Sequence, residues 1–427
     1  MRNIILQVLI KKSTVSRSKT IFEKNAKCSG NGWLFVDRLR SNHTIYWNFL
    51  FSVFFSGTDP LQYPTLLISF WQQSQKISMQ YPLFLFITCQ VGSEKPLKGE
   101  LFREFPQLRF AFSRPGFLTF KVVDEHCDPL VLVDSVRDRS VFARFVGVSL
   151  GKIAVDSPVA MVEQLEKFER PEKIRRVHFW TRDRHPVGEK GFEPFPTETD
   201  QVMERRIADA LGLCYGKTLL GEVVLDCVQV EPDLYWTGYH RVTDERSRFS
   251  GGLFPMETPT DMVSRAWLKF EEAIRWSGLP IGCGTRCADI GSSPGGASQV
   301  LLTRGAEVLG VDPAEMDPRI LKYPGFTHIR GRIGQVKRSL FRKVRYVIAD
   351  MNVAPNFTLD VLGELVSRRD TDIRGLLFTL KMFQPELAEM IGEYAQRLQN
   401  WGFDKVQMKQ LQFNRQEITV VAQRRIS

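Results

Sequence analysis

The stretch Arg286-Cys-Ala-Asp-Ile-Gly-Ser-Ser-Pro-Gly-Gly296 decides the fold of the C-terminal part of this 427-residue chain. A short apolar run ends at Asp289-Ile290-Gly291, and Pro294 with two glycines opens a helical pattern. The order of strand, tight turn and helix N-terminus presents free backbone N–H groups to a ligand in α/β sheets. The glycine spacing does not match a dinucleotide fingerprint, and no Lys-Ser or Lys-Thr follows as in a P-loop.

A second apolar run, Glu307–Asp312, follows about one helix later and ends in an acid. An acidic side chain at the tip of the second strand commonly holds a ribose diol. We therefore expect a nucleoside-bearing cofactor that is not held through a pyrophosphate. S-adenosylmethionine fits that description.

The rest of the C-terminal sequence alternates between strand and helix patterns. A helix is expected from Thr260 to Trp276, where apolar residues recur at helical spacing. Seven strands that finish in a two-strand hairpin are the layout of a Rossmann-like methyltransferase, which is an α/β fold. The expected strands cover 286–291, 307–312, 326–331, 344–351, 375–382, 405–413 and 417–424.

Residues 1–78 form an atypical N-terminal extension. They hold ten Lys and Arg against three Asp and Glu, so residues 79–427 carry only +3 of the net charge of +10. Bulk charge is therefore weak support for a nucleic-acid partner. The apolar runs Trp47–Phe55 and Pro64–Trp71 fall short of the ~20 residues of a membrane span. We interpret the extension as an artefact of start-site choice, with Met79 as the real start.

Alternating short strands and helices over residues 79–250 predict one or two small α+β units, followed by a linker at 251–259 and a methyltransferase domain at 260–427. Strands are expected at Leu118–Val123 and Leu130–Val133. The aromatic-rich segment Glu231–His240 is expected to form a turn between two strands. Its aromatics, with the nearby Arg241, Arg246 and Arg248, could stack on and pair with RNA, or they form a core with a solvated rim.

The seven cysteines are scattered and include no C-x-x-C pair. This pattern predicts neither a structural metal site nor a disulfide framework, and it favours a reducing cytoplasm.

The motifs together resemble those of a known family. Residues 256–427 are similar to the FtsJ-type ribose 2′-O-methyltransferases, and within that group to the RlmM-type enzymes. The residues that carry the resemblance are Ser264-Arg-Ala-Trp-Leu-Lys269, Asp289-Ile-Gly-Ser-Ser-Pro-Gly-Gly296, Val347-Ile-Ala-Asp350-Met, Leu377-Phe-Thr-Leu-Lys381-Met and Asn414-Arg-Gln-Glu417. Residues 79–250 resemble, more weakly, the RNA-binding half of that family, which includes a THUMP domain.

The resemblance implies methyl transfer from S-adenosylmethionine to a cytidine ribose of 23S ribosomal RNA, free or in a precursor of the large subunit. It implies no membrane and no metal, and it leaves the choice between monomer and dimer open. The implied catalytic residues are Lys269, Asp350, Lys381 and Glu417. The implied cofactor-binding residues are Ser264, Asp289, Gly291, Ser293, Pro294, Gly295, Gly296, Asp312 and Asp350. One departure concerns adenine recognition, because Arg332 stands where family members usually carry an acid.

The chemistry of ribose methylation explains the four catalytic residues. A ribose hydroxyl must be oriented and deprotonated, and a lysine with its ordinary pKa is protonated at neutral pH. We expect Lys381 to be the general base, because burial and Lys269 would lower its pKa, whereas Asp350 and Glu417 would oppose that change. A base methyltransferase and a non-catalytic RNA-binding module remain alternatives. The segment after Asp350 lacks the Asn/Asp-Pro-Pro-aromatic signature of the base methyltransferases.

Overall fold

The computed structural model describes residues 21–28, 33–41, 44–50, 83–124, 127–171, 173–367 and 370–425. The chain forms two units, Met1–Met79 and Gln80–Ser427, and each is described by itself. In the first unit, three strands form an antiparallel sheet: β1 (Ile21–Cys28), β2 (Trp33–Ser41) and β3 (Thr44–Leu50). The proposed start at Met79 and the run Pro64–Trp71 lie outside the described residues. Among the described residues, no helix has the length and apolar character needed to cross a membrane.

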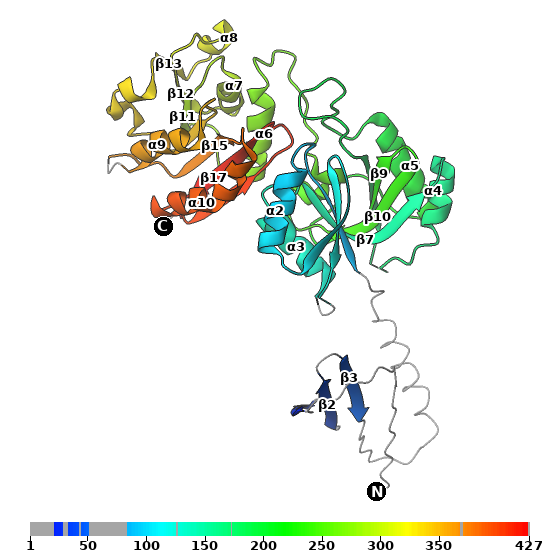
Figure 1. Ribbon diagram of the computed structural model, residues 1–427. Helices are drawn as coiled ribbons and strands as arrows, with labels where there is room; N and C mark the ends of the chain where they lie inside the picture. The colour runs from blue at the N-terminus through cyan, green and yellow to red at the C-terminus, as the bar shows by residue number, and fades with distance from the viewer. Residues whose placement is uncertain are drawn as a thin grey trace. The chain divides into compact units, whose positions relative to one another are not determined.

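The N-terminal half of the second unit is built on one seven-stranded sheet (Figure 1). Its strand order is β5-β6-β4-β7-β10-β9-β8, and only β8 and β9 pair in parallel. The strands are β4 (Phe84–Thr88), β5 (Leu108–Arg114), β6 (Phe117–Val122), β7 (Phe145–Ala154), β8 (Arg176–Thr181), β9 (Val223–Glu231) and β10 (Leu234–Arg241). The helices are α2 (Glu94–Glu104), α3 (Pro129–Arg139), α4 (Pro158–Leu165) and α5 (Glu198–Leu211).

Two local predictions for this half are wrong. The expected strand Leu130–Val133 lies inside helix α3, because the Asp128 carboxylate accepts hydrogen bonds from the N–H groups of Leu130 and Val131. A capping aspartate followed by proline starts a helix, and this local signal outweighs the strand preference of valine. The expected turn at 231–240 is much shorter, since the chain is extended again from Leu234 in β10.

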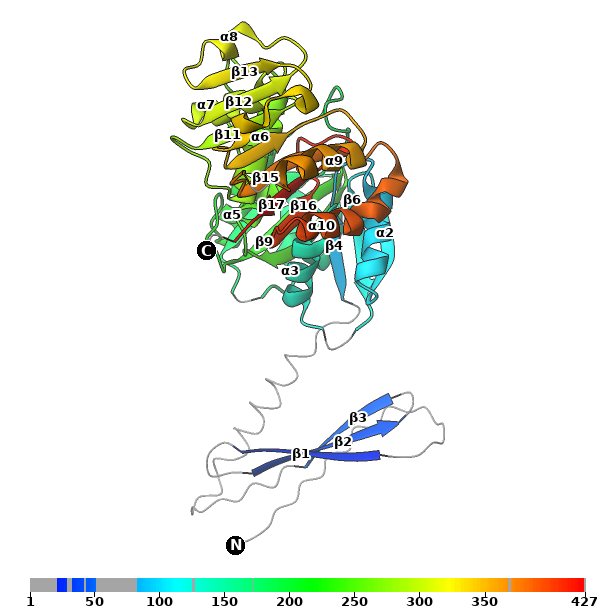
Figure 2. The ribbon, with the colours of Figure 1, turned by 90° about the vertical axis from the view of Figure 1, so that its left-hand side faces the viewer.

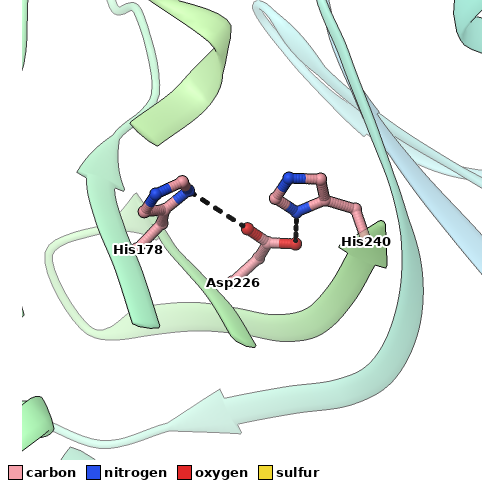
Figure 3. Close-up of side chains that lie close together, drawn as sticks. All are labelled: His178, Asp226 and His240. Carbon is pink, nitrogen blue, oxygen red and sulfur yellow. Dashed lines mark hydrogen bonds and ion pairs between the residues drawn. The ribbon is translucent and has the colours of Figure 1, made fainter. Parts of the chain in front are cut away.

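A buried polar cluster lies on one face of this sheet (Figure 3). Nδ1 of His240 lies 2.8 Å from Oδ2 of Asp226, and Nε2 donates to the carbonyl of Ser247 over 2.9 Å. His178 packs against His240 with a ring-centroid distance of 5.8 Å. All three side chains are at most 1% exposed. Burial lowers the pKa of His178 to about 3, and His240 adds to that shift.

This shift predicts a loss of stability in acid. Below a pKa of about 6.5 the unfolded chain binds a proton at His178 that the folded protein excludes down to about pH 3. As pH falls from 6 to 4, the wild type should therefore lose about 1.4 kcal/mol per pH unit relative to His178→Phe. Urea unfolding at several pH values measures this difference. His185→Gln, at an exposed site, is the control, and parallel pH profiles of wild type and His178→Phe would contradict the prediction.

The C-terminal half contains the predicted α/β sheet. Its order is β13-β12-β11-β14-β15-β17-β16, and β17 runs antiparallel to both of its neighbours (Figure 2). The strands are β11 (Arg286–Ile290), β12 (Glu307–Asp312), β13 (Phe326–Arg330), β14 (Tyr346–Ala349), β15 (Gly375–Lys381), β16 (Lys405–Lys409) and β17 (Glu417–Gln423). The seven strands and the final hairpin confirm the expected methyltransferase layout.

Helices cover both faces of this sheet. They are α6 (Ala266–Ser277), α7 (Gly296–Thr303), α8 (Pro318–Leu321), α9 (Pro355–Val366) and α10 (Ile391–Asn400). Alternate strand residues serve the two faces. Ile348 and Leu377 pack in the core that contains α6 and α7, whereas Val347 and Leu376 pack in the core that contains α9 and α10. Helix α6 begins at Ala266, six residues later than the periodicity predicted.

Residues 251–259 were expected to be a linker, and the first two of them pack against the N-terminal half. Gly251 has φ of +64°, and a Cβ there would lie 3.0 Å from the ring of Trp180. Both Gly251 and Gly252 are buried. The glycines thus allow the chain to turn closely over the first sheet before it enters the second half. The domain boundaries drawn at 250 and 260 stay a prediction.

Candidate active site

Four charged side chains from four elements meet at the carboxyl ends of β14 and β15. Lys269 lies in α6 and Asp350 directly follows β14. Lys381 is the last residue of β15 and Glu417 is the first of β17, and these two are direct cross-strand partners. The carboxyl edge of an open α/β sheet is where such folds bind ligands. The structure therefore brings together all four predicted catalytic residues, which we call the tetrad.

Each lysine of the tetrad contacts both carboxylates. Nζ of Lys381 donates to Oδ1 of Asp350 over 2.7 Å and also to Oε2 of Glu417. Nζ of Lys269 lies 3.1 Å from Oε1 of Glu417 and also donates to Oδ2 of Asp350. Lys381 is 8% exposed and Glu417 is 6% exposed. The result is a closed ring of two cations and two anions, shielded from solvent.

The ring sets the protonation states of its members. Burial disfavours the charged form of Lys381, but Asp350 and Glu417 outweigh burial and raise its pKa. Burial likewise opposes ionisation of Asp350, yet the two lysines hold the pKa of this carboxyl well below its usual range. The expected lowering of the pKa of Lys381 is therefore wrong for the protein alone. In this state Lys381 is an ammonium at neutral pH and cannot accept a proton.

Thr379 is a further member of this site that was not predicted from the sequence. Thr379 Oγ1 donates to Oδ1 of Asp350 over 2.6 Å and so helps to orient that carboxylate. Thr379 lies two residues before Lys381 on the same strand, and residues at this spacing share one face of a sheet. This two-residue spacing is the signal from which Thr379 could have been predicted as a neighbour of Lys381.

The predicted cofactor residues Gly291–Gly296 form the turn between β11 and α7, next to Asp350 of the tetrad, and we call this turn the glycine cradle. Gly291 has φ of +80°, and a Cβ there would lie 3.2 Å from the carbonyl oxygen of Asp350. Gly295 has φ of +122°, and a Cβ there would overlap Ile320. At Gly296, the first residue of α7, a Cβ would overlap Oγ of Ser264. The protein packs so closely against these three glycines that a side chain at any of them would displace the turn.

Asp312 closes the other side of the cradle at the end of β12. Its Oδ2 accepts from the N–H of Ser293 over 3.1 Å, and its Oδ1 accepts from the N–H of Ala314 over 2.7 Å. Pro294, which follows a cis peptide bond, continues the same loop. Each carboxylate oxygen can accept a further hydrogen bond. The fixed carboxylate can therefore receive the hydroxyl groups of a ribose.

Two polar atoms around the cradle are buried without a partner. They are Oγ of Ser264 and Oδ1 of Asp289. The other oxygen of Asp289 accepts from Ser298 over 2.6 Å, and burial raises the pKa of this carboxyl to about 7. Buried polar groups normally have a partner. Such orphaned atoms, next to a cradle that only glycine permits, fit a polar ligand such as S-adenosylmethionine.

The structure corrects the expectation of an RNA-contacting segment around 231–248. Tyr235 is 2% exposed and Trp236 is 9% exposed, and both belong to hydrophobic cores. Arg246 is 5% exposed, and Arg241 donates to Asp134. Among these residues the core interpretation therefore holds. Arg332, in contrast, is exposed beyond the end of β13.

The loop between β16 and β17, residues 410–416, joins the tetrad to the N-terminal half. Nη1 of Arg144 donates to Oε1 of Gln412 over 2.6 Å and to Oδ2 of Asp183 over 2.5 Å. Glu272, fully buried, accepts from the backbone N–H groups of Gln412 and Phe413. The loop leads directly into Glu417. Arg144 of the N-terminal half and Glu272 of α6 thus both hold Gln412, five residues before Glu417.

Comparisons with known proteins agree with this site. Residues 262–417 match the family model for FtsJ-like methyltransferases. Ribosomal RNA large subunit methyltransferase M of Actinobacillus pleuropneumoniae serotype 3 is 24% identical over 366 aligned positions, which cover 79% of this chain and 97% of that protein. The protein of the same name from Haemophilus influenzae (strain PittGG) is 30% identical over 223 positions, covering 46% of this chain and 56% of that protein.

One solved structure with a similar extent is TrmN from Thermus thermophilus. It is 13% identical, covers 80% of this chain and 99% of its own, and has a TM-score of 0.29. The family match spans the glycine cradle and all four residues of the tetrad. Residues 262–417 are therefore similar to FtsJ-like methyltransferases, and this similarity implies S-adenosylmethionine as the methyl donor.

Proposed function

We propose that the protein methylates the ribose 2′-hydroxyl of a cytidine in 23S ribosomal RNA, in the cytoplasm. The observation that carries this proposal is the tetrad beside the glycine cradle. In it, Nζ of Lys381 lies 2.7 Å from Oδ1 of Asp350 and Nζ of Lys269 lies 3.1 Å from Oε1 of Glu417. An oxygen nucleophile needs a proton acceptor, and we assign this role to Lys381, the more buried of the two lysines in the ring. The similarity to two proteins named for ribosomal RNA supports the substrate.

In this proposal the tetrad orients the hydroxyl and removes its proton. Neutral Lys381 would accept the proton of the hydroxyl at Nζ, and bound S-adenosylmethionine would supply the methyl group that this oxygen receives. Asp350 and Glu417 hold the two lysines in place, and Lys269 contacts the hydroxyl oxygen as its charge develops.

The charge of the tetrad explains how Lys381 becomes neutral. With both lysines protonated the ring carries no net charge, so loss of one proton leaves it negative. S-adenosylmethionine, when bound, supplies an activated methyl group on a positively charged sulfur. A cation next to the ring favours the form of Lys381 that has lost its proton. We infer that the protein is a poor base until its cofactor site is filled.

We also propose that residues 79–250 bind the RNA and that the later part of this region is THUMP-like. The supporting observation is that Arg144 and Gln90 of this region both donate hydrogen bonds to Gln412, in the loop that precedes Glu417. A separate binding region explains how a small catalytic ring can select one nucleotide of a large RNA. The boundaries at 250 and 260 are part of this proposal.

A methylation assay tests the function. Unmodified 23S ribosomal RNA made by transcription is incubated with the full chain and labelled S-adenosylmethionine, and the product is digested to nucleosides. Label in 2′-O-methylcytidine is the expected result. Label on a base would make the protein a base methyltransferase. Cofactor binding without any label in RNA would contradict ribose methylation and favour a non-catalytic module.

The role of Asp312 gives a separate prediction. Asp312→Asn should weaken the binding of S-adenosylmethionine about 10- to 100-fold, because a hydrogen bond to a charged group contributes roughly 1.5–3 kcal/mol. Titration calorimetry on the full chain measures this loss. Glu315→Gln, three residues away and exposed, is the matched control and should bind normally. Equal dissociation constants for Asp312→Asn and the wild type would remove Asp312 from the cofactor site.

A further inference from the structure

Two arginines lie beside the tetrad without an acidic partner. Arg265 precedes α6, one helical turn before Lys269, and Arg415 lies two residues before Glu417. Within the described part of the chain, neither guanidinium forms an ion pair with a carboxylate. Arg415 instead donates to the carbonyl of Gly188 over 3.4 Å. Both side chains are exposed.

The two guanidinium groups also lie close to each other. A Cβ at Gly188, where φ is +80°, would overlap both Nη2 of Arg415 and Nη1 of Arg265. The two nitrogens therefore surround one point next to the Gly188 backbone. Burial lowers the pKa of Arg265 and Arg415 adds to this shift, whereas Glu417 opposes it. The two guanidinium groups repel each other, and an anion bound between them would remove this repulsion.

The position of the two arginines beside the tetrad indicates which anion could bind between them. The same two elements supply an arginine and a tetrad residue each, so an anion between the arginines lies near the reacting hydroxyl. In RNA, the 2′-hydroxyl and the 3′-phosphate sit on adjacent carbons of the ribose. Guanidinium groups bind phosphate through paired hydrogen bonds, and the N-terminus of the 12-residue helix α6 adds a positive dipole end.

We propose that Arg265 and Arg415 bind the backbone phosphate next to the methylated ribose, which fixes the 2′-hydroxyl in the tetrad. This inference rests on the proposed function, since it assumes that the substrate is RNA. It adds a phosphate site that spans both halves of the protein, because Gly188 belongs to the N-terminal half. The arginines are thus positioning residues, whereas the tetrad carries out the proton transfer.

The test compares Arg265→Gln, Arg415→Gln and the double variant with the wild type, all as full chains. The probe is the unmodified 23S transcript, and its dissociation constant is measured between 50 and 300 mM salt. We expect about tenfold weaker binding at low salt for each single variant. The salt slope of the double variant should fall by about 0.7–0.9, the value for one phosphate contact. Binding of S-adenosylmethionine should not change.

Controls separate this proposal from other outcomes. Arg286→Gln removes an exposed arginine that already pairs with Glu307, and it should leave RNA binding unchanged. Arg415→Lys keeps the charge but not the paired hydrogen bonds, so it should restore the salt slope more fully than the affinity. Unchanged RNA affinity and slope in the double variant would overturn the proposal. Weaker cofactor binding instead would assign the arginines to the cofactor carboxylate.

The failure of the proposed function would look different. In that case the wild type itself would transfer no methyl group to the RNA. A wild type that methylates RNA, together with arginine variants of unchanged affinity, would contradict the phosphate site alone.

Discussion

Lys381→Ala should lower methyl transfer by about 10²- to 10⁴-fold, the usual contribution of a general base. Lys269 still contacts both carboxylates in this variant, so Asp350 and Glu417 keep a cationic partner. The fold and the binding of S-adenosylmethionine should therefore persist. Single-turnover rates with the unmodified transcript measure the effect. Lys337→Ala, at an exposed site away from the ring, should have the rate of the wild type.

The pH profile distinguishes a base from a lysine that only orients the substrate. Because the reaction needs neutral Lys381 and its pKa is raised, the rate should increase with pH through neutrality and level off only at alkaline pH. Glu417→Gln removes one of the carboxylates that raise this pKa. Its profile should therefore level off at lower pH, whatever happens to the maximal rate.

Two results would contradict this assignment. One is a Lys381→Arg variant with the turnover of the wild type, since a guanidinium keeps the positive charge but does not act as a base in proteins. The other is a Glu417→Gln profile with the inflection of the wild type. Either would leave Lys381 as a structural cation and require another proton acceptor.

Arg144→Met should destabilise the protein by about 3–5 kcal/mol, the usual cost of removing one partner of a buried ion pair. Arg144 is 3% exposed and Asp183 is 8% exposed, so the carboxylate would stay buried without its cation. The same change removes the contact to Gln412 between the two halves. Urea unfolding measures the loss, and activity at saturating cofactor shows whether the position of Glu417 also suffers.

A second variant keeps this prediction testable. Asp183→Asn combined with Arg144→Met removes the unpaired charge and should recover a substantial part of the lost stability. Arg286→Gln, which breaks an exposed ion pair, should change the stability by less than about 1 kcal/mol. If the single and double variants were equally stable, the ion pair would not be the source of the effect.

The sequence predicted the C-terminal half better than the N-terminal one, for physical reasons. Buried parallel strands are continuous apolar runs, so their ends, and with them Asp350 and Lys381, could be placed from the pattern. Half-buried antiparallel strands give weaker signals, and a capped helix was mistaken for a strand at Leu130–Val133. The aromatics of β10 pointed equally to RNA and to a core, and only packing decided between them.

Contacts between residues far apart in the chain could not be predicted from the sequence. The pairing of Arg144 with Gln412 joins residues that are 268 positions apart, and no local pattern marks either partner. The pKa of Lys381 likewise depends on how closely two carboxylates approach it, which spacing along the chain does not reveal. The proximity of Arg265 to Arg415 arises in the same way, from the approach of two separate elements.

The cross-strand pairing of Lys381 with Glu417 also limits how this enzyme can change over evolution. Successive residues of a strand point to opposite faces, so a slip of β17 by one position would turn Glu417 away from the lysines. A deletion or insertion of one residue that shifted this register would break the site without touching any catalytic side chain. We therefore expect related sequences to keep the number of residues in the loop 410–416.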